Sequence, residues 1–411
     1  MAKRVVAATA LALAAGALAT PAAGAGATPG LPLVVIDTER RIVDDPKVDA
    51  RMRIVSGGAT RFSGRIGIEI RGTSSMAYPK KQYAIEVRGA KGKGRDVRLL
   101  GMPRDDDWVL QGPYGDKTLM RNAVAYRTAR SLGQYASRTR FVEVVINDDL
   151  RGVFVLMEPP ELGEHRVAGE HLVEMTAPYK TKAGDRSFPS VTGQRFIHAD
   201  PKPKDMGPRR TRWIQRRLSG AEAALYGPSF ADAARGWRAH VDERSAVDAV
   251  LLHELLKNQD AFHASLFLHA APGKRLRIGP AWDFDIAMGN SDFGESARLE
   301  GWMTPGRPWA GRLLQDPGFA RALIARWRQL RAAGLREHVL AQVDANAARL
   351  RAAQARNFRR WPILGVRVWP NPVDPATGRA LPDHRSEVAA LRGWIDARVA
   401  WIDANVGGLA P

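Results

Sequence analysis

The sequence predicts an α+β protein in two regions, a β-rich one over residues 26–176 and a mainly helical one over 209–411. In the first region, several short runs alternate apolar and polar residues, a period of two that is typical of half-buried strands. In the second region, apolar residues recur every three or four positions, which is typical of amphipathic helices. The chain has 411 residues, of which 45% are apolar, so it can form a large core.

The expected strands of the first region begin with Leu33–Ile36 and end with a strong hairpin. In this hairpin, Phe141–Ile146 and Gly152–Met157 flank a turn at Asn147-Asp148-Asp149. Between these strands we expect a helix over 117–132 that ends at Gly133. The other expected strands are Ile66–Ile70, Lys81–Val87 and Asp107–Leu110.

Lys81 is the chemically distinctive residue of these strands. It is in phase with Tyr83, Ile85 and Val87, so we expect it to point to their apolar face, where an ammonium group needs an anionic partner. Together with the small-residue turn Arg71-Gly72-Thr73-Ser74-Ser75 before it, Lys81 would form a phosphate clamp. The alternative is an ordinary hairpin whose lysine extends to water.

The segment 177–208 joins the two regions and is rich in proline, glycine and lysine. It has no hydrophobic period, so we expect a loop or lid. His253 is expected on a buried helix as a hydrogen-bonded core histidine, and the histidines show no metal-binding spacing. Three amphipathic helices are expected after residue 288. They cover Phe319–Leu335, His338–Phe358 and Ser386–Val406.

Residues 1–25 have the pattern of a cleavable export signal. Lys3 and Arg4 precede a short apolar run, and Ala23-Gly24-Ala25 matches the small-residue cleavage pattern. The alternative, a membrane anchor, fits less well because the run is short and leads into Pro21. No later apolar run is long enough to span a bilayer, and no cysteine is present to form disulfides. We therefore expect a bacterial protein that is secreted or periplasmic and has no transmembrane span.

The formal net charge is +19, which can favour nucleic acid, an anionic surface or acidic substrates. Much of the excess is arginine spread along the expected helices, without the aromatic residues that a single-strand binder places between its basic ones. We therefore expect no specific nucleic-acid partner. The basic surface is instead available to contact an anionic cell envelope.

Residues 245–290 contain the most informative order of elements. A helix that begins with a capping box at Ser245 leads to a loop that carries Asp260. A hairpin over 266–278 follows and leads into Asp283-Phe284-Asp285. In a kinase active site the same order places one aspartate at the substrate hydroxyl and the aspartate before phenylalanine on Mg²⁺. The two aspartates lie about two dozen residues apart, so the hairpin can bring both to one cleft. The alternative is that these aspartates only cap a helix end and a turn.

Five motifs carry a resemblance to a known family that spans roughly residues 60–370. They are Arg71-Gly72-x-Ser74-Ser75 with Pro79-Lys80-Lys81-x-Tyr83; Leu119-x-Arg121-Asn122 with Ala125-Tyr126; Gly152-Val153-Phe154-x-Leu156-x-Glu158; Asn258-Gln259-Asp260 with Ser265–His269; and Trp282–Gly289. In this order they resemble the motifs of the CotH kinase family, which are atypical protein kinases related to spore coat protein H. Each motif alone is weak, but the ordered set is specific.

The resemblance implies an atypical protein-kinase-like fold of two lobes, a β-rich N-terminal lobe and a mainly helical C-terminal lobe. It also implies ATP and a divalent metal, Mg²⁺ or Mn²⁺, as cofactors, and transfer of the γ-phosphate to a Ser/Thr hydroxyl of a protein substrate. Asp260 would be the catalytic aspartate, with Asp283 and Asp285 as metal ligands. The implied nucleotide-binding residues are Lys81, Arg71, Ser74, Ser75 and Arg121, with Glu158 or the Glu174-Met175 pair at the adenine.

The sequence departs from the general kinase plan at two places. Ordinary kinases pair the strand lysine with a helix glutamate, but the helix over 117–132 has no acidic residue beyond its cap. A carboxylate partner for Lys81 would then be Asp116 or Glu143. Ser265 stands where kinases place an asparagine on a second metal ion, which puts that ion in doubt. Because ATP is scarce outside the cytoplasm, the competing hypothesis is a kinase-like surface, adhesion or coat-type protein that binds without catalysis.

Overall fold

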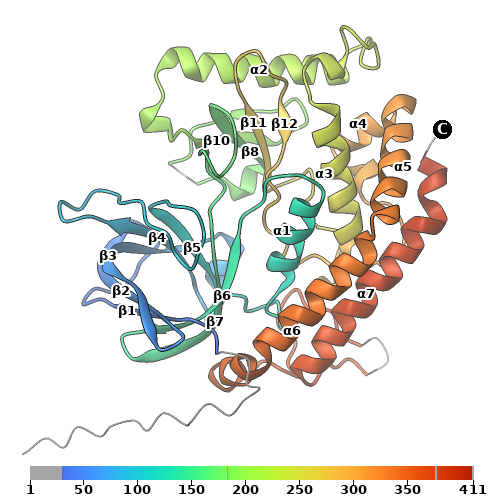
Figure 1. The fold of residues 1–411 in the computed structure, drawn as a ribbon. Helices are drawn as coiled ribbons and strands as arrows, with labels where there is room; N and C mark the ends of the chain where they lie inside the picture. Colours follow the sequence, from blue (N-terminus) through green and yellow to red (C-terminus); the bar gives the residue numbers. More distant parts are fainter. Residues whose placement is uncertain (1–29, 183, 375–376, 410–411) are drawn as a thin grey trace, which may run out of the picture.

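The computed structural model of the protein describes residues 30–182, 184–374 and 377–409, so the expected export signal at 1–25 lies outside the described residues. Within these residues the protein is α+β, as predicted, with two sheets and seven α-helices. The strands of the first sheet gather on one side of the molecule, and the long C-terminal helices lie on the other (Figure 1).

Seven strands form the first sheet. They are β1 (Leu33–Asp37), β2 (Val48–Ser56), β3 (Ala59–Arg71), β4 (Gln82–Arg88), β5 (Asp107–Gln111), β6 (Thr139–Ile146) and β7 (Asp149–Met157). They close into a barrel in the order β1-β2-β3-β4-β5-β7-β6, in which only β1 and β6 are parallel. Alternate residues such as Ile36, Ile68 and Ile85 fill the interior and are fully buried. Closure leaves no free strand edge in this sheet.

The barrel confirms the strands expected from the sequence and adds β2. In the β6–β7 hairpin, Asn147 and Asp148 both have positive φ, 48° and 62°, as a tight hairpin turn requires. In β2 every second residue from Val48 to Ile54 is buried, with charged residues between them. This alternation of apolar and charged residues is typical of a half-buried strand, although no strand was expected here.

The second sheet joins segments from both regions of the sequence. Its strands are β8 (His171–Thr176), β9 (Ser187–Pro189), β10 (Arg195–Asp200), β11 (Leu266–Ala270) and β12 (Arg277–Ile278). The spatial order is β12-β11-β8-β10-β9. The hairpin expected over 266–278 is therefore confirmed as β11–β12. The loop or lid expected over 177–208 is wrong in part, because β9 and β10 lie within it and β10 pairs with β8.

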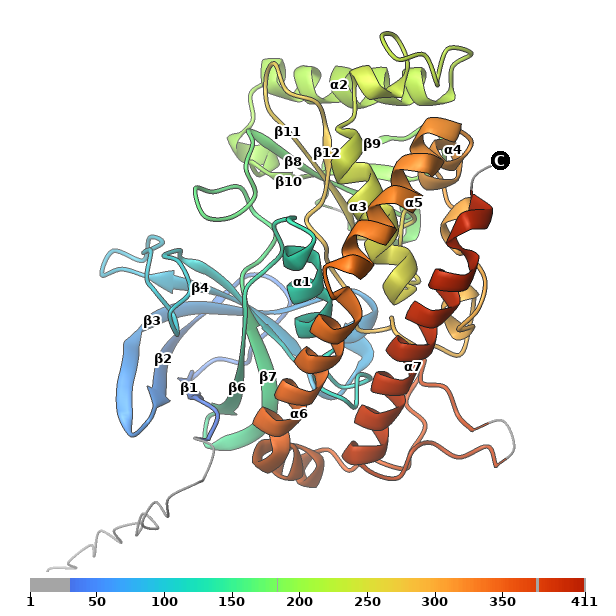
Figure 2. The same cartoon turned by 45° about the vertical axis from the view of Figure 1, so that its right-hand side comes forward.

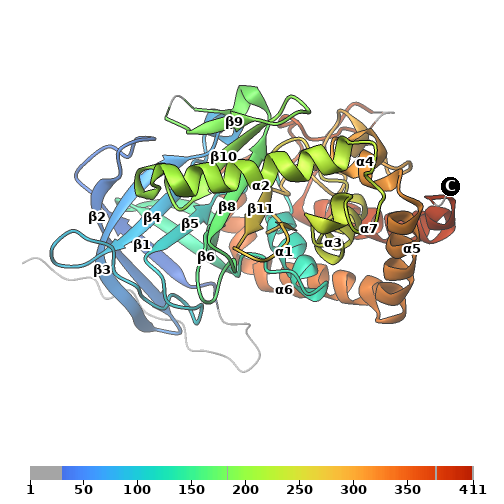
Figure 3. The same cartoon turned by 90° about the horizontal axis from the view of Figure 1, so that it is seen from above.

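Seven helices pack around and between the sheets. They are α1 (Arg121–Ser131), α2 (Pro208–Tyr226), α3 (Glu243–Leu256), α4 (Ala310–Leu314), α5 (Pro317–Ala332), α6 (Leu335–Arg360) and α7 (His384–Asn405). Helices α6 and α7 lie side by side, and one end of α6 packs against β7 of the barrel (Figure 2). Helix α2 runs across the second sheet (Figure 3), where Trp213 stacks on His171 of β8. The three expected C-terminal helices correspond to α5, α6 and α7.

Helix α3 is the buried centre of the helical part. Its N-cap is Asp242, whose carboxylate accepts a hydrogen bond from Ser245 N at 2.8 Å, so the expected start at Ser245 was three residues too late for the cap. Every residue from Ser245 to Leu256 is buried, and Lys257 ends the helix in the left-handed conformation. This ending turns the chain toward Asp260. Among the described helices, none is long and apolar enough to cross a membrane.

Candidate active site

A cleft of about 910 Å³ contains seven of the residues expected at the site. They are Arg71, Ser74, Ser75, Glu174, Asp260, Asp283 and Asp285. Arg71 ends β3 and the two serines follow it, Glu174 lies on β8, and the aspartates lie before and after the β11–β12 hairpin. The hairpin thus brings its two ends to one cleft, as the sequence predicted, and Ser265 also lines it.

Helix α1 holds the turn that carries Asp283 and Asp285. Phe284 N donates a hydrogen bond to Asn122 Oδ1 at 2.7 Å, and Asp283 N donates to the Tyr126 hydroxyl at 3.3 Å. The Tyr126 ring also stacks on Trp282, with ring centroids 5.7 Å apart. These contacts fix a turn in which Asp283 has a φ of 62°, a left-handed conformation that few residues adopt without support.

Burial and a neighbouring carboxylate destabilise the charged form of both carboxylates of this turn. Burial, and then the carboxylate of Asp260, raise the pKa of Asp283. Burial, and then Asp283, raise the pKa of Asp285 well above its ordinary value. A divalent cation between them would relieve both effects, because its charge favours the ionised carboxylates.

The residues present fit a magnesium-like ion. No group of three or more His, Asp or Glu side chains in the described residues forms a complete metal site. Mg²⁺ is commonly bound by one or two carboxylates, with phosphate oxygens and water as the remaining ligands. Asp283 and Asp285 supply that number of carboxylates.

Asp260 is held by a lysine that sequence reasoning did not identify. Lys180 Nζ donates to Asp260 Oδ2 at 2.7 Å, and both side chains are largely buried. Burial acts to lower the pKa of Lys180, but Asp260 and then Asp283 raise it above its ordinary value, so the lysine stays charged. Asn258 connects the two aspartate segments, because its Nδ2 donates to Asp283 O at 3.0 Å and its Oδ1 accepts from Asp260 N at 3.2 Å.

Arg71 supplies a second cation to the cleft. Its guanidinium lies over the Trp282 ring, 5.4 Å from the centroid. Burial lowers the pKa of Arg71, and Asp283 acts in the opposite direction. Gly72 then turns the chain with a φ of 119° into a short 3₁₀ helix over Ser74–Ala77. A Cβ at Gly72 would lie 2.1 Å from Ser75 Oγ, so glycine lets the two serines approach the cleft.

The prediction that Lys81 points to the apolar face was wrong. Strand β4 begins at Gln82, so the alternation does not extend to Lys81. The Nζ atom of Lys81 donates a hydrogen bond to Met76 O at 2.6 Å. Lys81 is not among the described residues that line the cleft. Its expected partners are engaged elsewhere, Asp116 with Arg121 and Glu143 with Arg356.

The buried lysine of this motif is Lys80, which is 2% exposed. Its Nζ donates to Asn357 Oδ1 of α6 at 2.8 Å and to Val153 O of β7 at 2.5 Å. Burial holds the pKa of Lys80 well below its ordinary value. Lys80 therefore connects the barrel to α6 and does not reach the cleft.

Three other expected nucleotide-binding residues do not line the cleft. Arg121 is buried, pairs with Asp116 at 2.6 Å and donates to Ala287 O at 3.1 Å, so it supports the chain just beyond Asp285. Glu158 is buried and pairs with Arg138 at 2.7 Å. Met175 is fully buried in the core.

The neighbours Glu174 and Met157 line the cleft in place of Met175 and Glu158. Burial, and then Asp283, raise the pKa of Glu174 to about 7. Of the three candidate adenine contacts, Glu158, Glu174 and Met175, only the Glu174 side chain therefore lies at the cleft. A β-strand places successive side chains on opposite faces, which explains why Glu174 and Met175 differ.

His253 is buried, as expected, but its hydrogen bonding is incomplete. The ring stacks on Phe284 of the aspartate turn, with centroids 5.2 Å apart, and Nδ1 has no hydrogen-bond partner among the described residues. Burial lowers the pKa of His253 to about 3. The neutral ring thus acts as a packing support beneath the turn.

The fold and site define an α+β protein whose cleft joins three aspartates to a lysine and an arginine, an arrangement suited to a divalent cation and an anionic ligand. A family model described as CotH kinase protein matches residues 68–402, and the chain belongs to that family. The match includes every residue of the candidate site. A search of the curated proteins gave no match.

Proposed function

We propose that the protein is a secreted atypical protein kinase that transfers the γ-phosphate of ATP to a Ser/Thr hydroxyl of a protein, with Mg²⁺ or Mn²⁺. The observation that carries this proposal is the meeting of Asp260, Asp283 and Asp285 in one cleft with Lys180 and Arg71. In this proposal the barrel serves as the N-terminal lobe and the helical part as the C-terminal lobe. Export would follow from cleavage after residue 25.

The residues of the cleft have distinct roles in the proposed reaction. A bound divalent cation would neutralise the phosphate oxygens. Asp283 and Asp285 would hold that ion, while Asp260 would orient the attacking hydroxyl and accept its proton. Lys180 and Arg71 would place positive charge beside the transferred phosphoryl group, the part that the sequence assigned to Lys81.

The competing proposal is a kinase-like protein that binds without catalysis. The position of Lys81 favours it, because the strand lysine of ordinary kinases contacts the phosphates and this one donates to Met76 O instead. That proposal expects no metal-dependent nucleotide binding. It also expects unchanged biological activity after substitution of Asp260 or Asp283.

Calorimetric titration with metal–ATP, together with a phosphoryl-transfer assay using labelled ATP, separates these cases. Asp283→Asn removes a charge from the ion's ligands, so nucleotide affinity and transfer should fall together. Asp260→Asn should leave affinity nearly intact and lower the transfer rate by about 10²–10⁴-fold. Asp344→Asn, on the exposed face of α6 beside Arg392, is the matched control and should change neither. Absence of nucleotide binding in the unsubstituted protein with either metal would refute the kinase proposal.

A further inference from the structure

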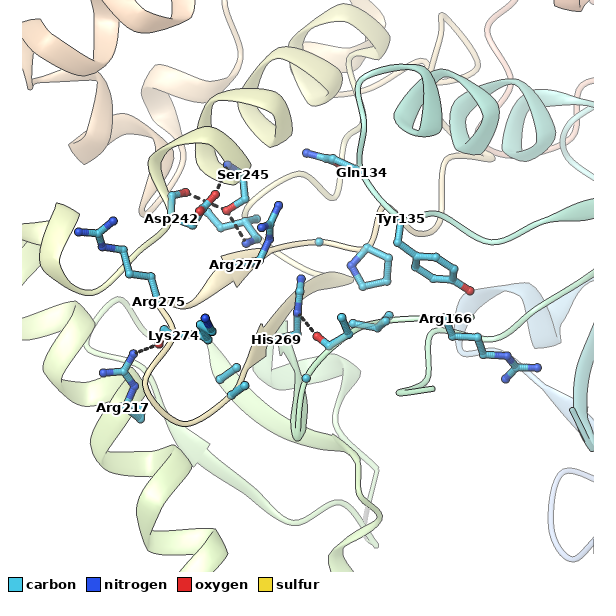
Figure 4. Close-up of a pocket in the computed structure, with 18 of the residues that line it drawn as sticks. Gln134, Tyr135, Arg166, Arg217, Asp242, Ser245, His269, Lys274, Arg275 and Arg277 are labelled. Carbon is cyan, nitrogen blue, oxygen red and sulfur yellow. Dashed lines mark hydrogen bonds between the residues drawn. The ribbon is translucent and has the colours of Figure 1, made fainter. Parts of the chain in front are cut away.

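A second cavity, of about 1040 Å³, shares no lining residue with the aspartate cleft. It is bordered by the β11–β12 turn, by the loop over 166–169 and by the start of α3. Figure 4 shows the side chains that surround it. Of the family motifs only His269 reaches this cavity, and the proposed phosphoryl transfer gives the cavity no role.

The cavity is strongly basic. Its lining contains one aspartate, Asp242, and five arginine or lysine side chains. The basic residues are Arg166, Arg217, Lys274, Arg275 and Arg277. Arg166 is neutralised by Asp105 and Glu161, at 3.1 and 2.6 Å. The other four form no ion pair with any described residue, and they lie along the hairpin and the facing helix (Figure 4).

Two donors at the cavity also lack an acceptor. Arg217 Nη2 donates to Lys274 O at 2.6 Å, but Arg217 Nε is buried without a hydrogen-bond partner among the described residues. Gln134 Nε2 is buried and unpartnered in the same sense. An unpaired buried donor costs free energy, so both groups favour a ligand rich in acceptor oxygens.

The remaining polar groups of the cavity do not cancel its charge. The Asp242 carboxylate accepts a hydrogen bond from Ser245 N at 2.8 Å and so faces the first turn of α3. His269 Nδ1 bonds to Ala168 O at 2.6 Å, and burial lowers the pKa of this histidine to about 4. His269 is therefore neutral at pH 7 and neither adds to nor reduces the positive charge.

The basic lining is not simply a consequence of the positive net charge of the chain. The aspartate cleft, in the same molecule, is lined by six acidic and five basic side chains. The acidic ones are Glu69, Glu174, Asp185, Asp260, Asp283 and Asp285; the basic ones are Arg71, Lys180, Lys182, Lys202 and Arg307. Of the two cavities, the second therefore has the excess of positive charge.

We propose that this cavity binds an acidic peptide segment of a protein partner. Its volume is at the upper end of the range of ligand pockets, and its concave shape suits a chain better than a flat lipid surface. Nucleic acid is disfavoured because Tyr135 is the one Phe, Tyr or Trp side chain of the described residues that lines the cavity, and Arg138 lies over one face of its ring, 6.0 Å from the centroid, so the cavity offers little surface for stacking bases. Peptide binding here does not depend on the proposed kinase activity.

Fluorescence anisotropy of a labelled peptide of alternating glutamate and glycine tests the proposal with the purified protein. The double variant Arg275→Ala/Arg277→Ala should weaken binding by roughly 3- to 30-fold, since each exposed ion pair contributes modestly. The control Arg351→Ala/Arg359→Ala removes the same charge from exposed positions on α6 and should leave affinity unchanged. Binding to the unsubstituted protein should also weaken as salt is added.

The charge-reversed variant Arg275→Glu/Arg277→Glu gives a gain-of-function check that does not depend on a loss. It should bind a matching lysine–glycine peptide better than the unsubstituted protein does. Equal losses in the cavity and control variants would refute the proposal, because net charge alone would then explain binding. The proposal would also be refuted if binding of a single-stranded oligonucleotide or of a phosphatidylglycerol vesicle required Arg275 and Arg277 while binding of the acidic peptide did not.

Discussion

Replacing Lys180 with methionine should lower phosphoryl transfer far more than it lowers stability. The ammonium lies 2.7 Å from Asp260 Oδ2, and the two side chains retain 18% and 13% of their exposure. At an effective dielectric constant near 20, two charges about 4 Å apart attract by roughly 4 kcal/mol. Water at the cleft screens this attraction, and measured partly exposed pairs contribute only about 1 kcal/mol. The melting temperature should therefore fall by no more than about 2–4 °C.

The expected loss of rate is larger because, in the proposed reaction, the lysine would act on the reacting groups. A preorganised donor that stabilises charge in the transition state typically contributes about 10²–10³-fold to the rate. Lys180→Met should therefore lower the turnover number by about this factor while metal–ATP affinity changes less. The double variant with Asp260→Asn should lose much less than the product of the single losses, because both residues act on the same step.

Lys204→Met is a matched control in the same segment between the two regions. Lys204 is exposed, forms no ion pair with a described residue and lines neither cavity, so its loss should leave turnover and melting temperature nearly unchanged. Two results would refute the assignment. Increased turnover in Lys180→Met would mean that the lysine restrains Asp260. A loss of rate that disappears at lower temperature, together with a large loss of stability, would mean a structural lysine.

Two further predictions concern stability. Burial lowers the pKa of His253 to about 3. Below about pH 6.5 this histidine is therefore protonated in the unfolded chain but still neutral in the folded chain. The free energy of unfolding should then fall by about 1.4 kcal/mol for each pH unit as the pH falls toward 3. Urea unfolding at pH 7 and pH 5 should show about 2 kcal/mol less pH dependence in His253→Phe than in the unsubstituted protein, and equal pH dependence would contradict this account. Asp116→Asn removes the carboxylate that lies 2.6 Å from the buried Arg121 guanidinium, so it should lower the free energy of unfolding in urea by about 3–5 kcal/mol. The surface variant Asp344→Asn should lower it by under about 1 kcal/mol. A similar small cost in both would show that the Arg121 pair is not needed for the fold.

The elements with a clear hydrophobic period could be predicted from the sequence. Helices α5, α6 and α7 and most strands of the barrel were located because their apolar residues keep one period over many positions. Strands β9 and β10 were missed because they are short, three and six residues, and lie in a segment dominated by proline, glycine and lysine. Their pairing with β8 depends on contacts that a local pattern does not contain.

The aspartates of the site could be predicted because each has a fixed relation to a recognisable element. Asp260 follows a buried helix, and Asp283 follows a hairpin whose two strands were both identified. Lys180 had no such relation, since it lies in a short 3₁₀ helix and its partner is 80 residues away in the sequence. Only the composition of the segment 177–208, rich in lysine between two regions, hinted that it carries charge to the cleft.

The exchange between Lys80 and Lys81 shows how a small error in a strand boundary moves a functional assignment. The phase of Tyr83, Ile85 and Val87 was predicted correctly, but β4 begins at Gln82, so the alternation does not decide where the side chains of Lys80 and Lys81 point. Lys80 occupies the buried position, but there it meets carbonyl oxygens and Asn357, with no carboxylate or open space for a phosphate. Neither lysine of the motif therefore reaches the cleft, and the positive charge beside Asp283 and Asp260 comes from Arg71 and Lys180. If the protein transfers phosphate, the negative charge of the phosphoryl group would be stabilised by Arg71 at the end of β3 and by Lys180 in the segment after β8. Substitution of Lys81 should therefore lower activity less than substitution of Lys180.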